Sequence, residues 1–163
     1  MAQFPGVKAT GPAMNAESDL IKLYSGRILA LAADIPHHGR LPAPTASAKR
    51  RSPLCGSTVT VDLVVTDGRV SDYAQDVKAC ALGQASAAVV GAAIIGCDAG
   101  QISRARDELS AMLKDGGPVP SVPFDGLEVL LPARDYKNRH ASILLALEAA
   151  AEAMAAANTA NPA

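Results

Sequence analysis

The fold of this chain is decided by residues 58–80, which read TVTVDLVVTDGRVSDYAQDVKAC. The first part, Thr58–Thr66, alternates apolar and polar side chains, which is the pattern of a half-buried antiparallel strand. Asp67-Gly68 predicts a hairpin turn, because glycine supplies the positive φ that such a turn needs. Arg69–Val77 is the returning strand, although its apolar residues fall on opposite faces. A two-stranded sheet of this kind needs helices over its apolar face.

Helical patterns lie on both sides of this hairpin. Residues 80–95 are apolar nearly all round, which predicts a buried central helix that ends at Gly96. Together with the hairpin, this predicts an α+β fold in which helices pack on a small antiparallel sheet. Three more segments with helical periodicity are expected to be helices: about 18–33 with a cap at Asn15 or Ser18, about 102–113, and about 138–155.

The length of 163 residues suits one domain with a hydrophobic core. We expect a disordered N-terminus over 1–15, a single domain over 16–156, and a disordered tail over 157–163. Inside that domain, the stretch from His37 to Pro53 is rich in proline and serine and is predicted to be a long loop.

Composition excludes several classes of function. The net charge of −1 offers no footprint for nucleic acid or an anionic membrane. No apolar run reaches the roughly 18–20 residues of a membrane span, and the first residues lack the pattern of a secretory signal. Three widely spaced cysteines do not form a disulfide framework, which favours a reducing, cytoplasmic location.

Two cysteines and one histidine are placed at the ends of regular elements. Cys80 begins a helix, where free backbone N–H groups and the cation Lys78 favour the thiolate. Cys55 precedes a glycine where the long loop meets the first strand. His140 lies in the first turn of the last helix, in register with its buried face. An inert buried cysteine or a packed histidine remains the plainer interpretation of each residue taken singly.

Cys97 is expected to be structural, because a helix of about 16 residues separates it from Cys80 by roughly 24 Å. The sequence has no Gly-rich phosphate loop after a strand, no Gly-x-Ser-x-Gly turn and no prominent carboxylate pair. It therefore predicts a protein that is not an enzyme.

Several short motifs occur in the order seen in one known family. The segment Pro53-Leu54-Cys55-Gly56 resembles Pro-x-Cys-Gly-Asp, and Lys78-Ala79-Cys80 with its Ala-Ser-rich helix resembles a Gly-Cys segment. Arg139-His140-Ala141-Ser142-Ile143-Leu144 resembles His-Cys-Ser-Ile-Leu. From about Leu23 to Met154, the chain resembles the NifU/IscU family of iron–sulfur cluster assembly scaffolds.

The resemblance implies a site built from Cys55, Cys80 and His140, but two usual ligands are missing. Ser57 occupies the position of the motif's aspartate, and Ala141 that of its third cysteine. With three ligands, a tetrahedral zinc keeps one open position. A [2Fe–2S] cluster needs four ligands, so a small thiol, a partner or a second subunit must complete it. Such a cluster should be labile, as suits a protein that passes it on.

Three hypotheses follow from these residues. The first is a scaffold-like protein that binds iron or a transient [2Fe–2S] cluster and transfers it to acceptor apoproteins. The second is a zinc-binding accessory in sulfur transfer. The third is a degenerate paralogue that keeps the fold as an interaction module without metal. The resemblance implies a cysteine desulfurase as partner, whereas the oligomeric state is left open.

Overall fold

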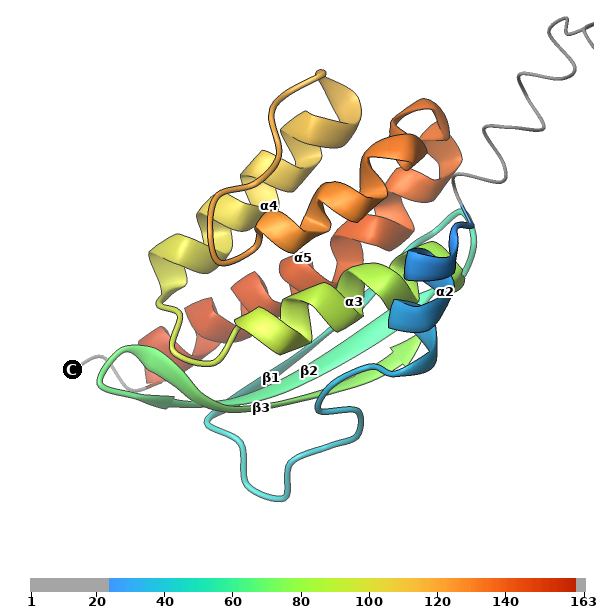
Figure 1. Cartoon of the computed structure of the whole chain (residues 1–163). Helices are drawn as coiled ribbons and strands as arrows, with labels where there is room; N and C mark the ends of the chain where they lie inside the picture. Colours follow the sequence, from blue (N-terminus) through green and yellow to red (C-terminus); the bar gives the residue numbers. More distant parts are fainter. Residues whose placement is uncertain (1–23, 161–163) are drawn as a thin grey trace, which may run out of the picture.

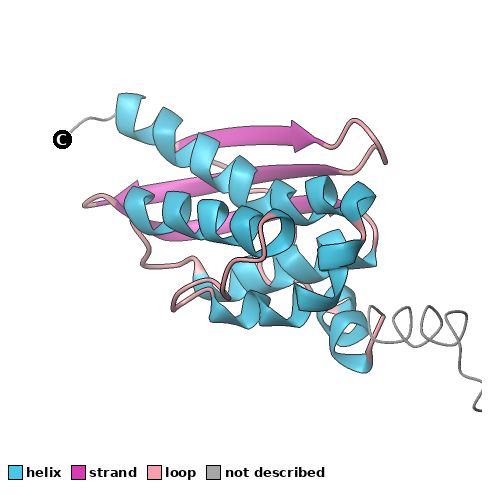
Figure 2. Cartoon of the chain, turned by 90° about the horizontal axis from the view of Figure 1, so that it is seen from above, coloured by secondary structure: helices cyan, strands magenta, loops and turns pink. Residues whose placement is uncertain are grey.

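The computed structural model describes residues 24–160. A three-stranded antiparallel sheet forms one layer, helices α3 and α5 lie on one of its faces, and α4 and the 3-10 helix η2 pack over those two helices (Figure 1, Figure 2). The predicted α+β class is confirmed. The elements are α2 (Gly26–Ala33), β1 (Ala46–Arg51), β2 (Thr58–Thr66), β3 (Arg69–Lys78), α3 (Ala81–Ala93), α4 (Ala99–Lys114), η2 (Asp125–Asp135) and α5 (Lys137–Ala160).

The β2–β3 hairpin forms where the sequence predicts it. Its turn has positive φ at both central residues, 54° at Asp67 and 78° at Gly68. The weak pattern of the returning strand is explained by a β-bulge, which shifts the register between Val64 and Val65. One extra residue turns Val70 and Tyr73 to the same face, where each is 1% exposed. The prediction that these two side chains lie on opposite faces is therefore wrong.

The prediction of an unstructured loop over 37–53 is also wrong. Residues 46–51 form the edge strand β1, which pairs antiparallel with β2 and places Ala48 opposite Val61. The strand is hard to recognise because its inward residues are alanines and Arg50. Arg50 reaches the carboxylates of Glu148 and Glu152 on α5, at 3.9 and 3.3 Å.

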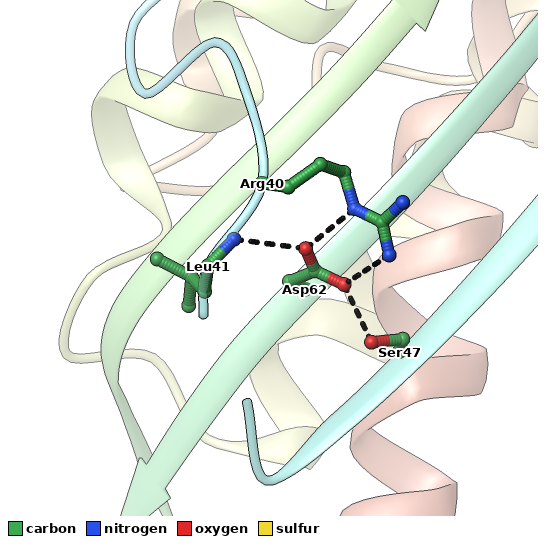
Figure 3. A network of polar contacts seen from close by, with 4 residues as sticks. All are labelled: Arg40, Leu41, Ser47 and Asp62. Carbon is green, nitrogen blue, oxygen red and sulfur yellow. Dashed lines mark hydrogen bonds and ion pairs between the residues drawn. The ribbon is translucent and has the colours of Figure 1, made fainter. Parts of the chain in front are cut away.

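The chain between α2 and β1 crosses the face of the sheet that the helices leave open. Figure 3 shows how Asp62, on the outer face of β2, holds this crossing segment. Its carboxylate accepts hydrogen bonds from Arg40 Nε at 2.7 Å and Nη2 at 3.1 Å, and from the backbone N–H of Leu41 at 3.0 Å. Ser47 on β1 donates a fourth at 2.5 Å. A carboxylate on the open face is thus fully buried and fully bonded.

The helix boundaries differ from prediction at both ends of the domain. Helix α2 begins at Gly26, because Ser25 is extended and its hydroxyl accepts a hydrogen bond from Ile28 N. The predicted caps Asn15 and Ser18, and the expected disordered segment 1–15, lie outside the described residues. Helix α5 continues to Ala160, so the first four residues of the predicted disordered tail are helical. Residues 161–163 are not described.

Helix α5 contains a stretch that is long and apolar enough to cross a membrane by composition, Lys137–Thr159, contrary to the prediction that no such run exists. However, 72% of its apolar window is buried within the fold. It contacts β1, β2, α3 and α4. The central helix of a globular core has the same composition, so this stretch is weak evidence for a membrane segment.

Candidate functional site

The first thiol lies in the turn that joins β1 to β2. Ser52 N donates to Ser57 O at 2.8 Å, and Gly56 N donates to Ser52 O at 2.9 Å. Gly56 has a φ of 72°, which glycine adopts without steric cost. The turn exposes Cys55, whose sulfur lies 3.4 Å from Ser52 Oγ and 3.1 Å from Ser57 Oγ.

The second thiol lies at the same end of the sheet as the first. Cys80 follows the last residue of β3 by two positions and is the N-cap residue of α3, with an extended backbone. It is partly buried. Because Thr58 pairs with Lys78 in the sheet, the chain leaving β3 passes close to the turn that carries Cys55.

Close packing of α3 against α5 adds a hydroxyl to this pair. Gly83 has no side chain, so α5 approaches until Ser142 Oγ lies 2.6 Å from where a Cβ on Gly83 would be. One turn further, Ser86 Oγ donates to Ile143 O at 2.7 Å. The approach places Ser142 Oγ 3.6 Å from Cys80 Sγ.

A continuous path of polar contacts joins the two sulfurs. Ser142 Oγ donates to Ser57 Oγ at 3.1 Å, and Ser57 Oγ contacts Cys55 Sγ. Since the Ser142 proton points to Ser57, the Ser57 proton is free to point to Cys55. The sequence analysis did not select Ser142 and noted Ser57 only as a missing aspartate. The small residues facing each other on α3 and α5 are the signal that could have identified Ser142.

Both thiols of this site ionise more readily than an ordinary cysteine. Hydrogen bonds from Ser52, Ser57 and the Ser57 backbone lower the pKa of Cys55 to about 7. Burial alone would raise the pKa of Cys80, but the N–H groups of the first α3 turn, the Ser142 hydroxyl and the charge of Arg139 outweigh it and lower that pKa. The expected helix N-terminal effect on Cys80 is therefore present, with Arg139 rather than Lys78 as the cation that acts.

The third predicted site residue is bonded to η2 and not to the thiols. His140 is only 4% exposed, as its register on the helix indicates. Its Nε2 lies 3.0 Å from Ala133 O and 2.9 Å from Arg134 O, so the ring is bonded to η2. It also lines a surface pocket of about 460 Å³ with Lys114 and other residues of α4 and η2. Among residues 24–160, no three His, Cys, Asp or Glu side chains are placed to hold one metal ion. Ligation by the trio stays a prediction.

Cys97 differs from the two site thiols in every respect. It is buried beyond the far end of α3 and donates to Ala93 O at 3.4 Å. Burial, and then the charge of Asp98, raise its pKa. Its predicted separation from the candidate site is confirmed.

The fold and the two gathered thiols define an α+β domain with a cysteine site at the end of its hairpin. Among solved structures, the chain is similar to a nitrogen-fixing NifU-like protein (N-terminal) from Brucella abortus, with 44% identity and a TM-score of 0.84. The match covers 86% of this chain and 98% of that one. The chain therefore belongs to the NifU-like family.

Two more distant structures share the fold. One is a hypothetical protein with 24% identity and a TM-score of 0.73, where the match covers 83% of this chain and 98% of that one. The other is assigned as an iron–sulfur cluster assembly scaffold for the SUF system of Fervidobacterium islandicum AW-1, with 20% identity and a TM-score of 0.73, over 82% and 98% of the two chains. No family model matches the chain, and no curated protein does.

Proposed function

We propose that this protein is a scaffold in iron–sulfur cluster assembly, which binds iron or a labile [2Fe–2S] cluster as cargo and passes it to acceptor proteins. The observation that carries the proposal is the convergence of Cys55 and Cys80 through two serine hydroxyls. Membership of the NifU-like family and a distant structural neighbour assigned as a cluster scaffold support the same role.

The chemistry of these groups suits a soft metal. Thiolate is the form of cysteine that binds iron and zinc, and a pKa of about 7 leaves a large fraction of Cys55 as thiolate near neutral pH. The hydroxyls of Ser57 and Ser142 contact the sulfurs, and Ser57 can donate a hydrogen bond to Cys55 while Ser142 donates to Ser57. Hydrogen bonds to the sulfurs and exposure to solvent tune the potential and lability of iron–sulfur groups.

His140 bonds to two carbonyl oxygens through Nε2, so Nδ1 is the ring nitrogen that is left to bind a metal. The oxygens are those of Ala133 and Arg134, and Nε2 bonds to them in a buried position. Among residues 24–160, however, no third His, Cys, Asp or Glu side chain is placed to hold a metal ion with the two thiols. The proposal therefore rests mainly on the two thiols, with His140 as a further candidate ligand.

A scaffold needs a source of sulfur and a recipient. We infer a cysteine desulfurase as the donor and apoproteins as acceptors, in the cytoplasm, because a SUF-system scaffold shares this fold. The exposure of Cys55 supports exchange with such partners, since a cargo held at the surface can be transferred without unfolding.

Anaerobic reconstitution with ferric iron and sulfide tests the proposal. We expect visible charge-transfer absorbance from the wild type and from Cys97→Ala, and its loss from Cys55→Ala, Cys80→Ala and the double variant. Cys97→Ala is the matched control, because it removes a thiol distant from the site. Equal absorbance from the wild type and the double variant, or none from either, would contradict the proposal. Elemental analysis of protein purified without added metal addresses the zinc alternative, which predicts about one zinc per chain.

A further inference from the structure

We propose that the open border of the sheet, strand β1, binds an extended acidic segment of another protein as a fourth, antiparallel strand. The proposal concerns a border of the sheet that contains no thiol, so it goes beyond the proposed scaffold function and does not depend on it. The partner is defined by its chemistry, which is a backbone that continues the sheet and a carboxylate at every second residue.

The fold covers one border of the sheet and leaves the other open. Along β3, Gln75 O accepts from Gly39 N at 2.8 Å, and Gln75 N donates to His37 O at 3.0 Å. Val70, also on β3, forms two such backbone bonds, at 2.7 and 2.9 Å, with the segment that follows α3. At the other border, within residues 24–160, no strand pairs with β1 on the side away from β2 (Figure 1).

The register of β1 determines which of its backbone groups face the open side. Ser52 N donates to Ser57 O at 2.8 Å, so these two residues form a hydrogen-bonded pair with the β1–β2 register. Hydrogen-bonded pairs alternate along antiparallel strands, so every second residue of β1, counted back from Ser52, bonds to β2. The residues between them direct N–H and C=O groups to the open side. They are Ser47, Lys49 and Arg51.

The side chains of these residues make the open border positive. Lys49 and Arg51 are exposed on the outer face of the sheet, and within the described part of the chain neither forms a salt bridge. Arg51 pairs with Thr58, which pairs with Lys78, so this row of the sheet carries a cation at both borders. In the next row, Asp76 lies two strands from Lys49, at a distance of roughly 10 Å. The two cations of β1 are therefore available to an incoming chain.

Charge and backbone pattern together select the occupant. In a fourth strand, the residues opposite Lys49 and Arg51 lie on the same face as those cations, where opposite charges attract and like charges repel. Carboxylates two residues apart would meet both cations. The residue between the carboxylates lies opposite Arg50, which already contacts Glu148 and Glu152 on α5, so we expect an uncharged side chain there. A second copy of β1 would oppose these cations with cations of its own and is disfavoured.

The open border leads to an exposed turn. Strand β1 ends at Arg51, and the turn that follows contains Leu54, whose side chain is 74% exposed, and Cys55. A segment that pairs with β1 therefore brings the rest of its protein beside this turn. In strand addition, backbone hydrogen bonds give affinity and alternate side chains give specificity. Here the open backbone groups supply the affinity, and Lys49 and Arg51 supply the selection for acid.

Nuclear magnetic resonance of the metal-free full chain tests the proposal with a synthetic peptide. The probe is the end-capped peptide Ser-Glu-Val-Glu-Val-Glu-Ser, and its counterpart has lysine in place of glutamate. We expect the acidic peptide to shift the amide signals of Ser47, Lys49 and Arg51 and to show cross-strand proton contacts with β1, whereas the basic peptide shifts nothing. Absence of shifts at millimolar acidic peptide, or shifts confined to other elements, overturns the proposal. Because no metal is present, either result is independent of iron binding.

Methylation of the peptide nitrogens separates strand addition from charge attraction alone. In an antiparallel strand opposite β1, the glutamate N–H groups point to the border and the valine N–H groups point away from it. N-methylation of two glutamates should abolish binding, and N-methylation of the two valines should leave most of it. Equal affinity of the two methylated peptides, or weaker binding of the second, overturns the antiparallel strand.

Protein variants test the two cations. Lys49→Gln combined with Arg51→Gln should weaken binding of the acidic peptide about tenfold, because two cross-strand ion pairs are lost. The matched control is Lys114→Gln combined with Lys137→Gln, which removes two exposed cations from α4 and α5 and should leave the affinity unchanged. Equal affinities of the two double variants would contradict the selection for acid by β1.

Discussion

Gly83 on α3 and Ser142 on α5 lie so close that a Cβ on Gly83 would be 2.6 Å from Ser142 Oγ and 3.2 Å from Ser142 O. The same hydroxyl lies 3.6 Å from Cys80 Sγ. The packing of two core helices and the geometry of the thiol site therefore depend on one contact.

Gly83→Ala should destabilise the protein by about 1–3 kcal/mol, because the new methyl group also meets Ala79 Cβ at 2.8 Å and the helices must separate. Urea unfolding at neutral pH measures the effect. Gly26→Ala is the control, since no atom lies within 4 Å of a Cβ at that helical position. A loss equal in both variants would show that close packing is not the cause.

The pH dependence of Cys55 reactivity follows from its pKa of about 7. Alkylation by iodoacetamide, followed by mass spectrometry, should rise through a midpoint near pH 7 at Cys55. Cys97 should stay unmodified in the folded protein, because it is buried and its pKa is raised. Ser57→Ala removes a donor to the thiolate and should move the Cys55 midpoint to higher pH. Ser71→Ala, on the exposed hairpin, should leave it in place.

The lowered pKa of Asp62 predicts that the protein loses stability in acid. Burial alone would raise its pKa, but hydrogen bonds from Arg40, Ser47 and Leu41 outweigh burial and lower it. A carboxyl group whose pKa is depressed by folding stabilises the protein above its unfolded pKa of about 3.9, and this contribution is lost as the pH falls through the folded pKa. Arg40→Gln removes the cation and should raise that folded pKa.

We therefore expect Arg40→Gln to be less stable than the wild type at pH 7, by an amount kept small because the guanidinium is 56% exposed. Acid unfolding followed by circular dichroism should begin at higher pH in this variant than in the wild type. Arg104→Gln replaces an exposed arginine on α4 and serves as the comparison. Identical acid transitions in wild type and Arg40→Gln would refute the assigned role of the pair.

Gln75 should be one of the costliest polar residues to replace. It is 0% exposed, its amide donates to Pro36 O at 3.2 Å and Ala87 O at 2.9 Å, and it accepts from Tyr73 Oη at 3.2 Å. Gln75→Leu leaves these buried groups without partners and should cost about 2–4 kcal/mol in thermal or urea unfolding. Gln84→Leu, at a partly exposed α3 position, should change stability by no more than about 0.5 kcal/mol.

The hairpin and the central helix were predictable because their hydrophobic periodicity is strong. Strand β1 was not, because alanines and a salt-bridged Arg50 line its inner face and give no apolar alternation. The β-bulge that places Val70 and Tyr73 on the same face could not be predicted either, because an alternating hydrophobic pattern assumes a strand with an unbroken register.

The site was predictable only in part. Cys55 and Cys80 could be selected as site residues because each lies at the end of a predicted strand or helix. The position of His140 in the register of the last helix indicated that it is buried. The direction of the His140 ring depends on carbonyl oxygens of η2, a helix whose extent the sequence indicated poorly because Pro132 lies inside it. The contact between the Ser57 and Ser142 hydroxyls depends on the distance between α3 and α5, and no local sequence pattern indicates that distance.

Strand β1 also decides how the molecule avoids aggregation. Its open backbone edge could template a further strand from another copy, yet Lys49, Arg50 and Arg51 occupy half of its length. Antiparallel pairing of two such edges would bring the cationic side chains of the two copies close together, where they repel each other. Fibril-like stacking is therefore disfavoured at this edge, and strand-to-strand association of concentrated protein should be weak.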